Sequence, residues 1–195
     1  MANVPVAPLD PTTLPRGQRA RRDRIVVAAI TLLERDEYDA IQMRDIADAA
    51  GVALATIYRY FTSKEHLYAA ALLEWAEEFP RAGPTPRGGD DEARFRALMR
   101  RAVRAFERHP QMMRAEMVLE HSNDANARAL FDEFGKRNVA ALAGALPSID
   151  PDTAAAIVET ANAVMVTRLR SWAHGRCSIR DVDRSVQRCL DLLFA

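Results

Sequence analysis

The side chains best suited to recognise a charged ligand lie together in the stretch "GVALATIYRYFTSK", at positions 51–64. Thr56 and Tyr58 offer hydroxyl groups to phosphate oxygens, and Arg59 can pair with guanine or hold a phosphate. The stretch contains two basic residues and no acidic residue. The whole chain has a net charge of zero, so attraction of an anionic partner must come from local groups like these.

A short helix, a turn and a second short helix are predicted to position these groups. Met43–Ala50 has helical spacing of its apolar residues and ends at Gly51, a typical C-terminal cap. The next helix is predicted at Leu54–Phe61. This is the helix-turn-helix layout, in which the second helix enters the major groove, which is about 12 Å wide. Small side chains at Ala53 and Ala55 would allow a close approach to DNA.

Helical periodicity continues on both sides of this motif. One helix is predicted before it, at Arg19–Arg35, and a longer one after it, from Lys64 to about Glu78 with Ser63 as N-cap. Because no alternating run rich in valine or isoleucine demands a strand, the predicted fold is all-α with about nine helices. The remaining five helices are predicted at Glu92–Arg108, Met112–Leu119, Ala125–Leu146, Thr153–His174 and Ser178–Phe194.

Capping signals support the last two of these helices. Asp150 is placed as an N-cap with Pro151 at the first helical position. Ser178 and Asp181 have the spacing of a capping box.

Three prolines and three glycines in the 13 residues "FPRAGPTPRGGDD" predict a linker between two domains. The predicted divisions are a disordered arm at 1–17, a DNA-binding domain at 18–67 whose fourth helix continues to about 79, and a larger domain at 80–195. No apolar run has the length of a signal peptide or of a membrane span. We therefore expect no membrane association.

Composition and motifs argue against several other classes of protein. Apolar residues make up 49% of the chain and charged residues 28%, which is typical of a folded soluble protein. The two cysteines, Cys177 and Cys189, are expected to be reduced thiols in the cytoplasm. The histidines form no metal-binding pattern, and neither a P-loop nor a G-x-G-x-x-G motif is present. No catalytic residue, metal or cofactor is predicted, and a helical-bundle enzyme or a scaffolding helical protein remain the alternatives.

The stretch "IQMRDIADAAGVALATIYRYFTSKEHL" resembles the DNA-binding domain of the TetR family of bacterial repressors. The family often has threonine where this chain has Met43, and Gln42 or Arg44 could replace the phosphate contact. Beyond Trp75 the resemblance rests on helix number and length. The residues that match the family pattern are Ile46, Ala47, Ala50, Gly51, Val52, Thr56, Ile57, Tyr58, Tyr60, Phe61, Ser63, Lys64, Glu65 and Leu67.

The resemblance implies a homodimer that binds double-stranded DNA at a palindromic operator and is released by a small molecule. For Tyr60, packing against the first helix is the alternative to a phosphate contact. The arginine-rich stretch Arg16–Arg24 is either a solvated helix start or a further contact to DNA. The predicted DNA-binding residues are Gln42, Arg44, Ala53, Leu54, Ala55, Thr56, Tyr58, Arg59, Tyr60 and Lys64.

The resemblance further implies a ligand pocket in the C-terminal domain and a dimer interface on the last two helices. The apolar residues at helical spacing on these helices could equally form the core of a single chain. For the polar Asn162, a structural partner is the alternative to a ligand contact. The predicted pocket residues are Trp75, Phe95, Met99, Met113, Met117, Asn162 and Met165. The predicted interface residues are Val158, Leu169, Trp172, Val182, Val186, Cys189 and Leu193.

The predicted effector is a hydrophobic small molecule. The stretches "YDAIQMRDIADAAGVALATIYRYFTSKEHL" and "TRLRSWAHGRCSIRDVDRSVQRCLDLL" are similar to those of actinobacterial regulators of cholesterol and steroid catabolism. That similarity implies a steroid or fatty-acyl derivative, and a multidrug-type ligand is the alternative. The operator sequence, the regulated genes and the choice between repression and activation are not encoded in any motif of the chain.

Overall fold

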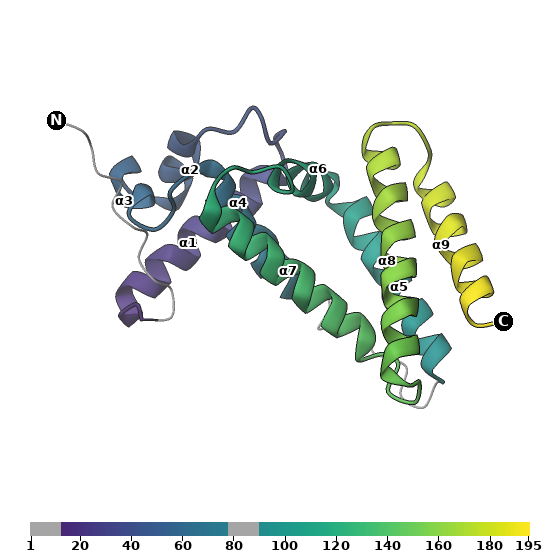
Figure 1. Ribbon diagram of the computed structural model, residues 1–195. Helices are drawn as coiled ribbons and strands as arrows, with labels where there is room; N and C mark the ends of the chain where they lie inside the picture. Colours follow the sequence, from purple (N-terminus) through teal and green to yellow (C-terminus); the bar gives the residue numbers. More distant parts are fainter. Residues whose placement is uncertain (1–12, 78–89) are drawn as a thin grey trace. The chain divides into compact units, whose positions relative to one another are not determined.

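The computed structural model describes residues 13–77 and 90–195, and over these ranges the chain forms helices and no strand (Figure 1). The predicted all-α class is therefore confirmed. The nine helices of the described ranges are α1 (Arg16–Leu33), α2 (Met43–Ala50), α3 (Leu54–Tyr58), α4 (Lys64–Glu77), α5 (Asp91–Arg108), α6 (Pro110–Leu119), α7 (Ala125–Ala143), α8 (Pro151–Ala173) and α9 (Ile179–Leu193).

The helix ends agree with the sequence pattern except at a few places. Helix α2 has the predicted bounds, whereas α3 ends at Tyr58 and not at Phe61. There the Tyr60 N–H donates to the Ile57 carbonyl oxygen at 2.9 Å, a bond to the third residue back that tightens the last turn. Helix α1 begins at Arg16, inside the predicted arm. Residues 1–12 of that arm and most of the predicted linker lie outside the described residues.

The predicted caps begin their helices as expected. The Ser63 Oγ accepts a hydrogen bond from the His66 N–H at 3.0 Å, which caps α4. Asp150 Oδ1 accepts one from the Thr153 N–H at 3.0 Å, ahead of Pro151. At α9, both reciprocal bonds of the capping box between Ser178 and Asp181 are present. Each cap satisfies an N–H group that a helix start would otherwise leave unpaired.

The contacts within the chain form two compact units, and the first of them is not continuous in sequence. It contains the chain up to Trp75 together with Ala115–Glu133. Helix α2 packs on both α1 and α3. The core of this unit consists of aliphatic and aromatic side chains with 0% exposure, among them Ile25, Ala29, Ile46, Ile57, Phe61 and Leu67.

The second unit contains Ala76–Arg114 and Phe134–Ala195. Within it α5, α8 and α9 pack against one another, and Figure 1 shows α8 and α9 running side by side. Arg96 on α5 forms an ion pair with Asp191 on α9, with 2.9 Å between the charged groups. The buried side chains of α5, α8 and α9 include Phe95, Met99, Val103, Val158, Met165, Leu169, Val182, Val186 and Leu190.

The turn between α2 and α3 depends on the backbone conformation of Gly51. Its φ is 64°, in the left-handed region that only glycine enters without steric cost. The Val52 N–H then donates to the Ala47 carbonyl oxygen at 3.0 Å, which closes α2 in the manner of a Schellman motif. This turn sets the direction in which α3 leaves α2.

Replacing Gly51 with alanine should lower the free energy of unfolding by about 1–2 kcal/mol, the cost of left-handed backbone for a residue with a Cβ. A Cβ at Gly51 would meet no atom within 4 Å, so the cost is conformational. Gly135 lies within α7 and its added Cβ also meets no atom within 4 Å. Gly135→Ala should therefore stabilise the protein, by about 0.5–1 kcal/mol. Urea unfolding followed by circular dichroism measures both, and effects of the same sign would contradict this account.

Candidate nucleic-acid interface

Helix α3 presents one face to the core and another to solvent. Ile57 is fully buried and anchors the helix to the first unit. Ala53, Ala55 and Arg59 are exposed, and the large Tyr58 side chain is 48% exposed. Leu54 and Thr56 are half-buried. An exposed tyrosine and arginine beside two small residues can approach the edge of a duplex without steric hindrance.

The start of α2 contributes two more exposed polar side chains, Gln42 and Arg44. The backbone N–H of Gln42 donates to Asp45 Oδ2 at 2.7 Å, and this bond orders the first turn of α2. Within the described residues, no ion pair engages the guanidinium of Arg44 or of Arg59. Both positive charges are therefore available to an anionic partner.

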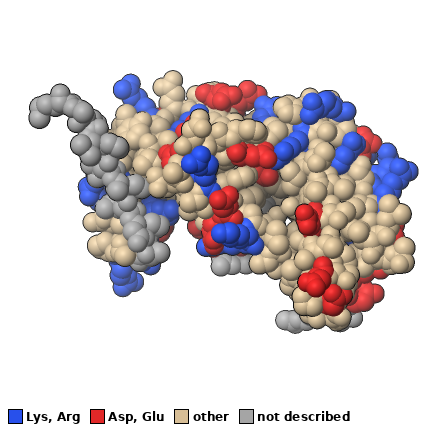
Figure 2. Space-filling model, viewed as in Figure 1, with Lys and Arg blue, Asp and Glu red and all other residues tan. Residues whose placement is uncertain are grey.

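More positive charge lies at the beginning of α1. Figure 2 shows blue side chains at the end of the molecule where α1 starts in Figure 1. Arg16, Arg21 and Arg24 are exposed, whereas Arg22 is half-buried and lies 5.3 Å from the centre of the Phe61 ring. Arg22 therefore has a packing role. For the exposed arginines, a solvated helix start and a contact to DNA both stay open.

Tyr60 must be removed from the predicted set of phosphate contacts. Its side chain is only 2% exposed, and its ring lies 6.5 Å from that of Phe61. The hydroxyl group is itself buried and has no hydrogen-bond partner in the part of the chain that the structure describes. The packing role, considered as the alternative, is the one that the structure shows.

Lys64 is engaged within the protein. Its Nζ donates to the carbonyl oxygen of Tyr38 and lies 4.1 Å from the centre of the Tyr38 ring. Burial lowers the pKa of Lys64, against the opposing effect of Asp39, Glu65 and Asp45. A contact between Lys64 and a phosphate would have to replace the bond to Tyr38.

A cluster that the sequence pattern did not predict joins the turn before α4 to the start of α7. Oδ2 of Asp124 accepts hydrogen bonds from Thr62 Oγ1 and from Ser63 Oγ, each at 2.6 Å. Asn126 Nδ2 donates to Thr62 Oγ1 at 3.3 Å. We call these four residues the Asp124 cluster. Asp124 could have been identified as an N-cap of α7 from its position, but its contacts to residues 61 and 62 positions away have no sequence signal.

The carboxylate of Asp124 also caps α7. Oδ1 accepts hydrogen bonds from the N–H groups of Asn126, at 2.8 Å, and of Ala127, at 3.3 Å. Burial opposes ionisation, but the hydrogen bonds from Ser63, Thr62 and these two N–H groups lower the pKa of Asp124 to about 2. Asp124 is therefore ionised at neutral pH.

His66 lies beneath the Asp124 cluster and is held in its neutral form. The Thr62 N–H donates to His66 Nδ1 at 3.1 Å, so this nitrogen carries no proton. The imidazole is 8% exposed and lies edge-on to Phe61, with 5.3 Å between ring centres. Burial lowers the pKa of His66, Asp124 acts against this shift, and Arg22 adds to it.

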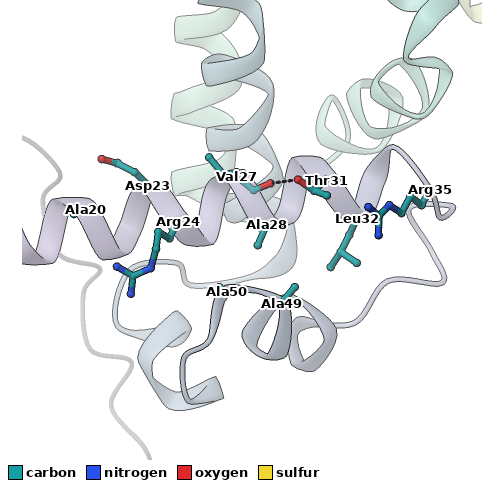
Figure 3. A pocket seen from close by; sticks show the side chains of 10 residues that line it. All are labelled: Ala20, Asp23, Arg24, Val27, Ala28, Thr31, Leu32, Arg35, Ala49 and Ala50. Atoms are coloured by element: carbon teal, nitrogen blue, oxygen red, sulfur yellow. Dashed lines mark hydrogen bonds between the residues drawn. The ribbon is translucent and has the colours of Figure 1, made fainter.

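A surface groove of about 620 Å³ lies between α1 and α2 (Figure 3). Its floor is apolar, and Arg24 and Arg35 lie towards opposite ends of it in the figure. None of its lining residues belongs to the predicted DNA-binding set, so the groove is separate from the exposed face of α3. The lining residues are Ala20, Asp23, Arg24, Val27, Ala28, Thr31, Leu32, Arg35, Ala49 and Ala50.

The predicted pocket residues are divided between the two units. Trp75 and Met117 belong to the first unit, and the other five belong to the second. Phe95, Met99, Met113 and Met165 are buried, at 0–2% exposure. Asn162 is half-buried, and its Oδ1 accepts a hydrogen bond of 3.5 Å from Asn138 Nδ2. This structural partner is the alternative considered from the sequence, and the pocket itself stays a prediction.

The structure removes four of the seven residues from the predicted dimer interface. Val158, Leu169, Val182 and Val186 are 0–1% exposed within a single chain, so they form its own core and leave no surface for a partner. The other three predicted residues, Trp172, Cys189 and Leu193, are half-buried. Sequence reasoning missed Leu192, which is 81% exposed. The helical spacing of the predicted residues indicated the face of α9 that packs inward, and Leu192 lies outside that face.

Over residues 13–77 and 90–195, no group of three or more histidine, cysteine, aspartate or glutamate side chains is arranged to hold a metal ion. No helix in those ranges is long and apolar enough to cross a membrane.

The short α2, the left-handed turn at Gly51 and the exposed face of α3 together define a helix-turn-helix protein. A model of bacterial regulatory proteins of the TetR family matches residues 25–71, and a model of the tetracycline-repressor-like C-terminal domain matches residues 88–193. The chain belongs to the TetR family.

Similar proteins are found along most of the chain. The HTH-type transcriptional repressor KstR of Rhodococcus jostii is 32% identical over 179 residues, which cover 91% of this chain and 84% of that protein. KstR of Mycolicibacterium smegmatis is 32% identical over 184 residues, with 91% and 89% covered. Both relatives are transcriptional repressors.

Solved structures show the same fold. A TetR transcriptional regulator from Rhodococcus sp. RHA1 has a TM-score of 0.76 and 26% identity, with 91% of this chain and 97% of that chain covered. FadR of Thermus thermophilus, solved in complex with lauroyl-CoA, has a TM-score of 0.66 and 20% identity, with 89% and 93% covered.

The free energy of unfolding should fall as the pH is lowered below 6.5, the ordinary pKa of histidine. The folded protein binds a proton at His66 less tightly than the unfolded chain does. The contribution of neutral His66 is therefore complete above pH 6.5 and is lost as the pH falls through the lowered pKa of the folded state. His66→Asn retains an acceptor for the Thr62 N–H and cannot titrate. Urea unfolding between pH 7 and pH 5 should show a shallower pH dependence in this variant, and identical slopes would refute the assignment.

Proposed function

We propose that this protein is a transcriptional repressor that binds a palindromic DNA operator as a homodimer and is released from it by a hydrophobic small molecule. The observation that carries the proposal is the geometry of α3. The buried Ile57 anchors the helix to the core, while Ala55 and Tyr58 on the helix and Arg59 directly after it remain exposed. A short helix with this exposed face, entered through a left-handed turn, is suited to the major groove.

The charges support DNA as the partner of this face. The net charge of the whole chain is zero, but the stretch 51–64 carries only basic charge, and exposed arginines begin α1. Phosphate contacts made by such residues position a protein on a duplex, and contacts to base edges give specificity. Arg59 directly follows α3, and its guanidinium can read a guanine through two parallel hydrogen bonds.

Selection from random duplex DNA should yield a palindrome of two short half-sites, and Arg59→Ala should weaken binding to it. The expected loss is about 1–3 kcal/mol with relaxed specificity at one base pair if Arg59 reads a guanine. If Arg59 holds a phosphate, the loss is uniform across sequences and the salt dependence of binding becomes shallower by about one ion.

Arg35→Ala is the matched control, because it removes the same charge from an exposed residue outside the predicted contact set. Fluorescence anisotropy over a range of salt concentrations separates these outcomes. Equal losses for the two arginine variants would count against α3 as the reading helix, and no enrichment by the wild-type protein at low salt would refute the DNA-binding function.

We infer that the homodimer forms through α8 and α9. The burial of four predicted residues shifts the proposed interface to the partly exposed Trp172, Cys189 and Leu193, and to the exposed Leu192 that precedes Leu193. An exposed leucine at the end of an otherwise amphipathic helix is suited to contact with a second copy of the chain.

Leu192→Glu should weaken the dimer, because each subunit would lose apolar burial of roughly 1.5–3 kcal/mol and gain a charge at the interface. Sedimentation equilibrium would measure the change in the dissociation constant. Val139→Glu is the control: Val139 is 46% exposed, but it lies on α7, outside the proposed interface. A dimer that tolerates Leu192→Glu as well as it tolerates Val139→Glu would exclude this end of α9 from the interface.

The proposed effector is a steroid or fatty-acyl derivative. The similarity to actinobacterial regulators of steroid catabolism supports a steroid. Thermus thermophilus FadR, which shares the fold, was solved with lauroyl-CoA bound, and this supports a fatty-acyl derivative. A multidrug-type ligand is the second candidate, favoured by the flexible methionines among the predicted pocket residues.

Release requires a ligand that binds one conformation better than the other. Binding to a palindrome needs the two recognition helices to face half-sites about 34–36 Å apart, or a multiple of this distance. A ligand that shifts α4 and favours a different separation of the recognition helices would lower operator affinity. Operator binding that is unchanged at saturating ligand would refute this mechanism.

A further inference from the structure

In the Asp124 cluster, one carboxylate serves the first turns of two helices. Ser63 is the N-cap of α4, and Asp124 is the N-cap of α7. The Ser63 hydroxyl donates to Asp124 Oδ2, so the two caps are bonded directly to each other although they lie 61 residues apart in the chain. Both helix starts carry partial positive charge, which the ionised carboxylate between them neutralises.

Each hydroxyl of the cluster both donates and accepts a hydrogen bond. The Thr62 hydroxyl donates its one proton to Asp124 at 2.6 Å and accepts a hydrogen bond from the Asn126 amide, and its oxygen also lies 3.1 Å from His66 Nδ1. The Ser63 hydroxyl donates to Asp124 and accepts from the His66 N–H. Hydrogen bonds to an ionised carboxylate are shorter and stronger than those between neutral groups.

The cluster holds the chain immediately after the recognition helix. Helix α3 has five residues and ends at Tyr58, so it is too short to be stable by itself. Buried Phe61 fixes the chain three residues later, and the next two residues, Thr62 and Ser63, are bonded to Asp124. The exit of α3 is therefore held from one side by apolar packing and from the other by the start of α7.

We propose that Asp124 is a positioning residue for DNA recognition, through which the segment Ala115–Glu133 sets the operator affinity of α3. With the cluster closed, α3 and the start of α4 are held in the arrangement that binds the operator. A displacement of the start of α7 opens the cluster and lowers the affinity without any change in the residues that touch DNA. The proposal rests on the DNA-binding function proposed above.

A direct contact between Thr62 and a phosphate is the competing explanation for any effect of Thr62 on binding, and it predicts the opposite behaviour at Asp124. If the Thr62 hydroxyl served a phosphate, Asp124 would compete for it and repel the backbone. Removing the charge of Asp124 would then leave affinity unchanged or raise it. A positioning role predicts that the same change lowers affinity.

The test compares Thr62→Val and Asp124→Asn with the wild-type protein on the selected operator. Valine has the shape of threonine without its hydroxyl, and asparagine still caps α7 but lacks the negative charge. Each should weaken operator binding about tenfold, within the range found for coupled sites. Thr62→Ser keeps the hydroxyl and should bind like the wild type.

Two further readouts separate positioning from a phosphate contact. The double variant should bind about as tightly as either single variant, because both changes remove the same interaction. The salt dependence of binding should be the same in all four proteins, whereas loss of a phosphate contact would reduce its slope by about one ion. Additive losses, a reduced salt slope in Thr62→Val, or tighter binding by Asp124→Asn would overturn the proposal.

Hydrogen exchange tests the cluster without DNA. Amides at 124–127 should exchange about fivefold faster in Thr62→Val, and those at 62–66 about fivefold faster in Asp124→Asn. If each change affects only its own segment, the cluster does not join the two helices and the proposal fails. If exchange is coupled but operator affinity is unchanged, the positioning role fails. Wild-type protein that selects no DNA would instead refute the proposed function, and with it the role of Asp124 in recognition.

Discussion

A helix of five residues such as α3 cannot be stable by itself in water, because one turn of helix does not recover the entropy of ordering its backbone. The proposed DNA-reading surface therefore depends on tertiary packing, above all on the burial of Ile57 and Phe61 on either side of the exposed Tyr58 and Arg59. The core holds the backbone in place so that the neighbouring side chains can remain in solvent. The rest of the first unit, including the turn at Gly51 and the caps of α2 and α4, keeps this short segment in one orientation.

Much of this arrangement has a local cause and was predictable from the sequence. Gly51 ends α2 because it tolerates a positive φ, and Ser63, Asp150 and Ser178 begin their helices because their side chains satisfy free N–H groups. Ile57 and Phe61, which match the family pattern, are both fully buried. These features depend on a residue and its neighbours within one turn.

The parts that were not predictable depend on the tertiary fold. Tyr60 has a polar tip and could have faced either way, and only the packed core shows that it is buried. On α8 and α9, periodicity identified an apolar stripe but not whether its partner was the same chain or another one. The structure assigns Val158 and Val186 to their own chain. The bonds from Asp124 to Thr62 and Ser63 join residues that no local pattern relates.

The first compact unit has a consequence for how such regulators can be recombined. Because the unit contains Ala115–Glu133 as well as the N-terminal helices, it does not end where the predicted linker begins. A chimaera made by cutting in that linker would join the N-terminal helices to a foreign segment in place of Asp124 and Asn126. The Thr62 hydroxyl would then lose the carboxylate that accepts its hydrogen bond. A functional chimaera should therefore take the N-terminal helices and the segment Ala115–Glu133 from the same parent protein, although the two are separate in sequence.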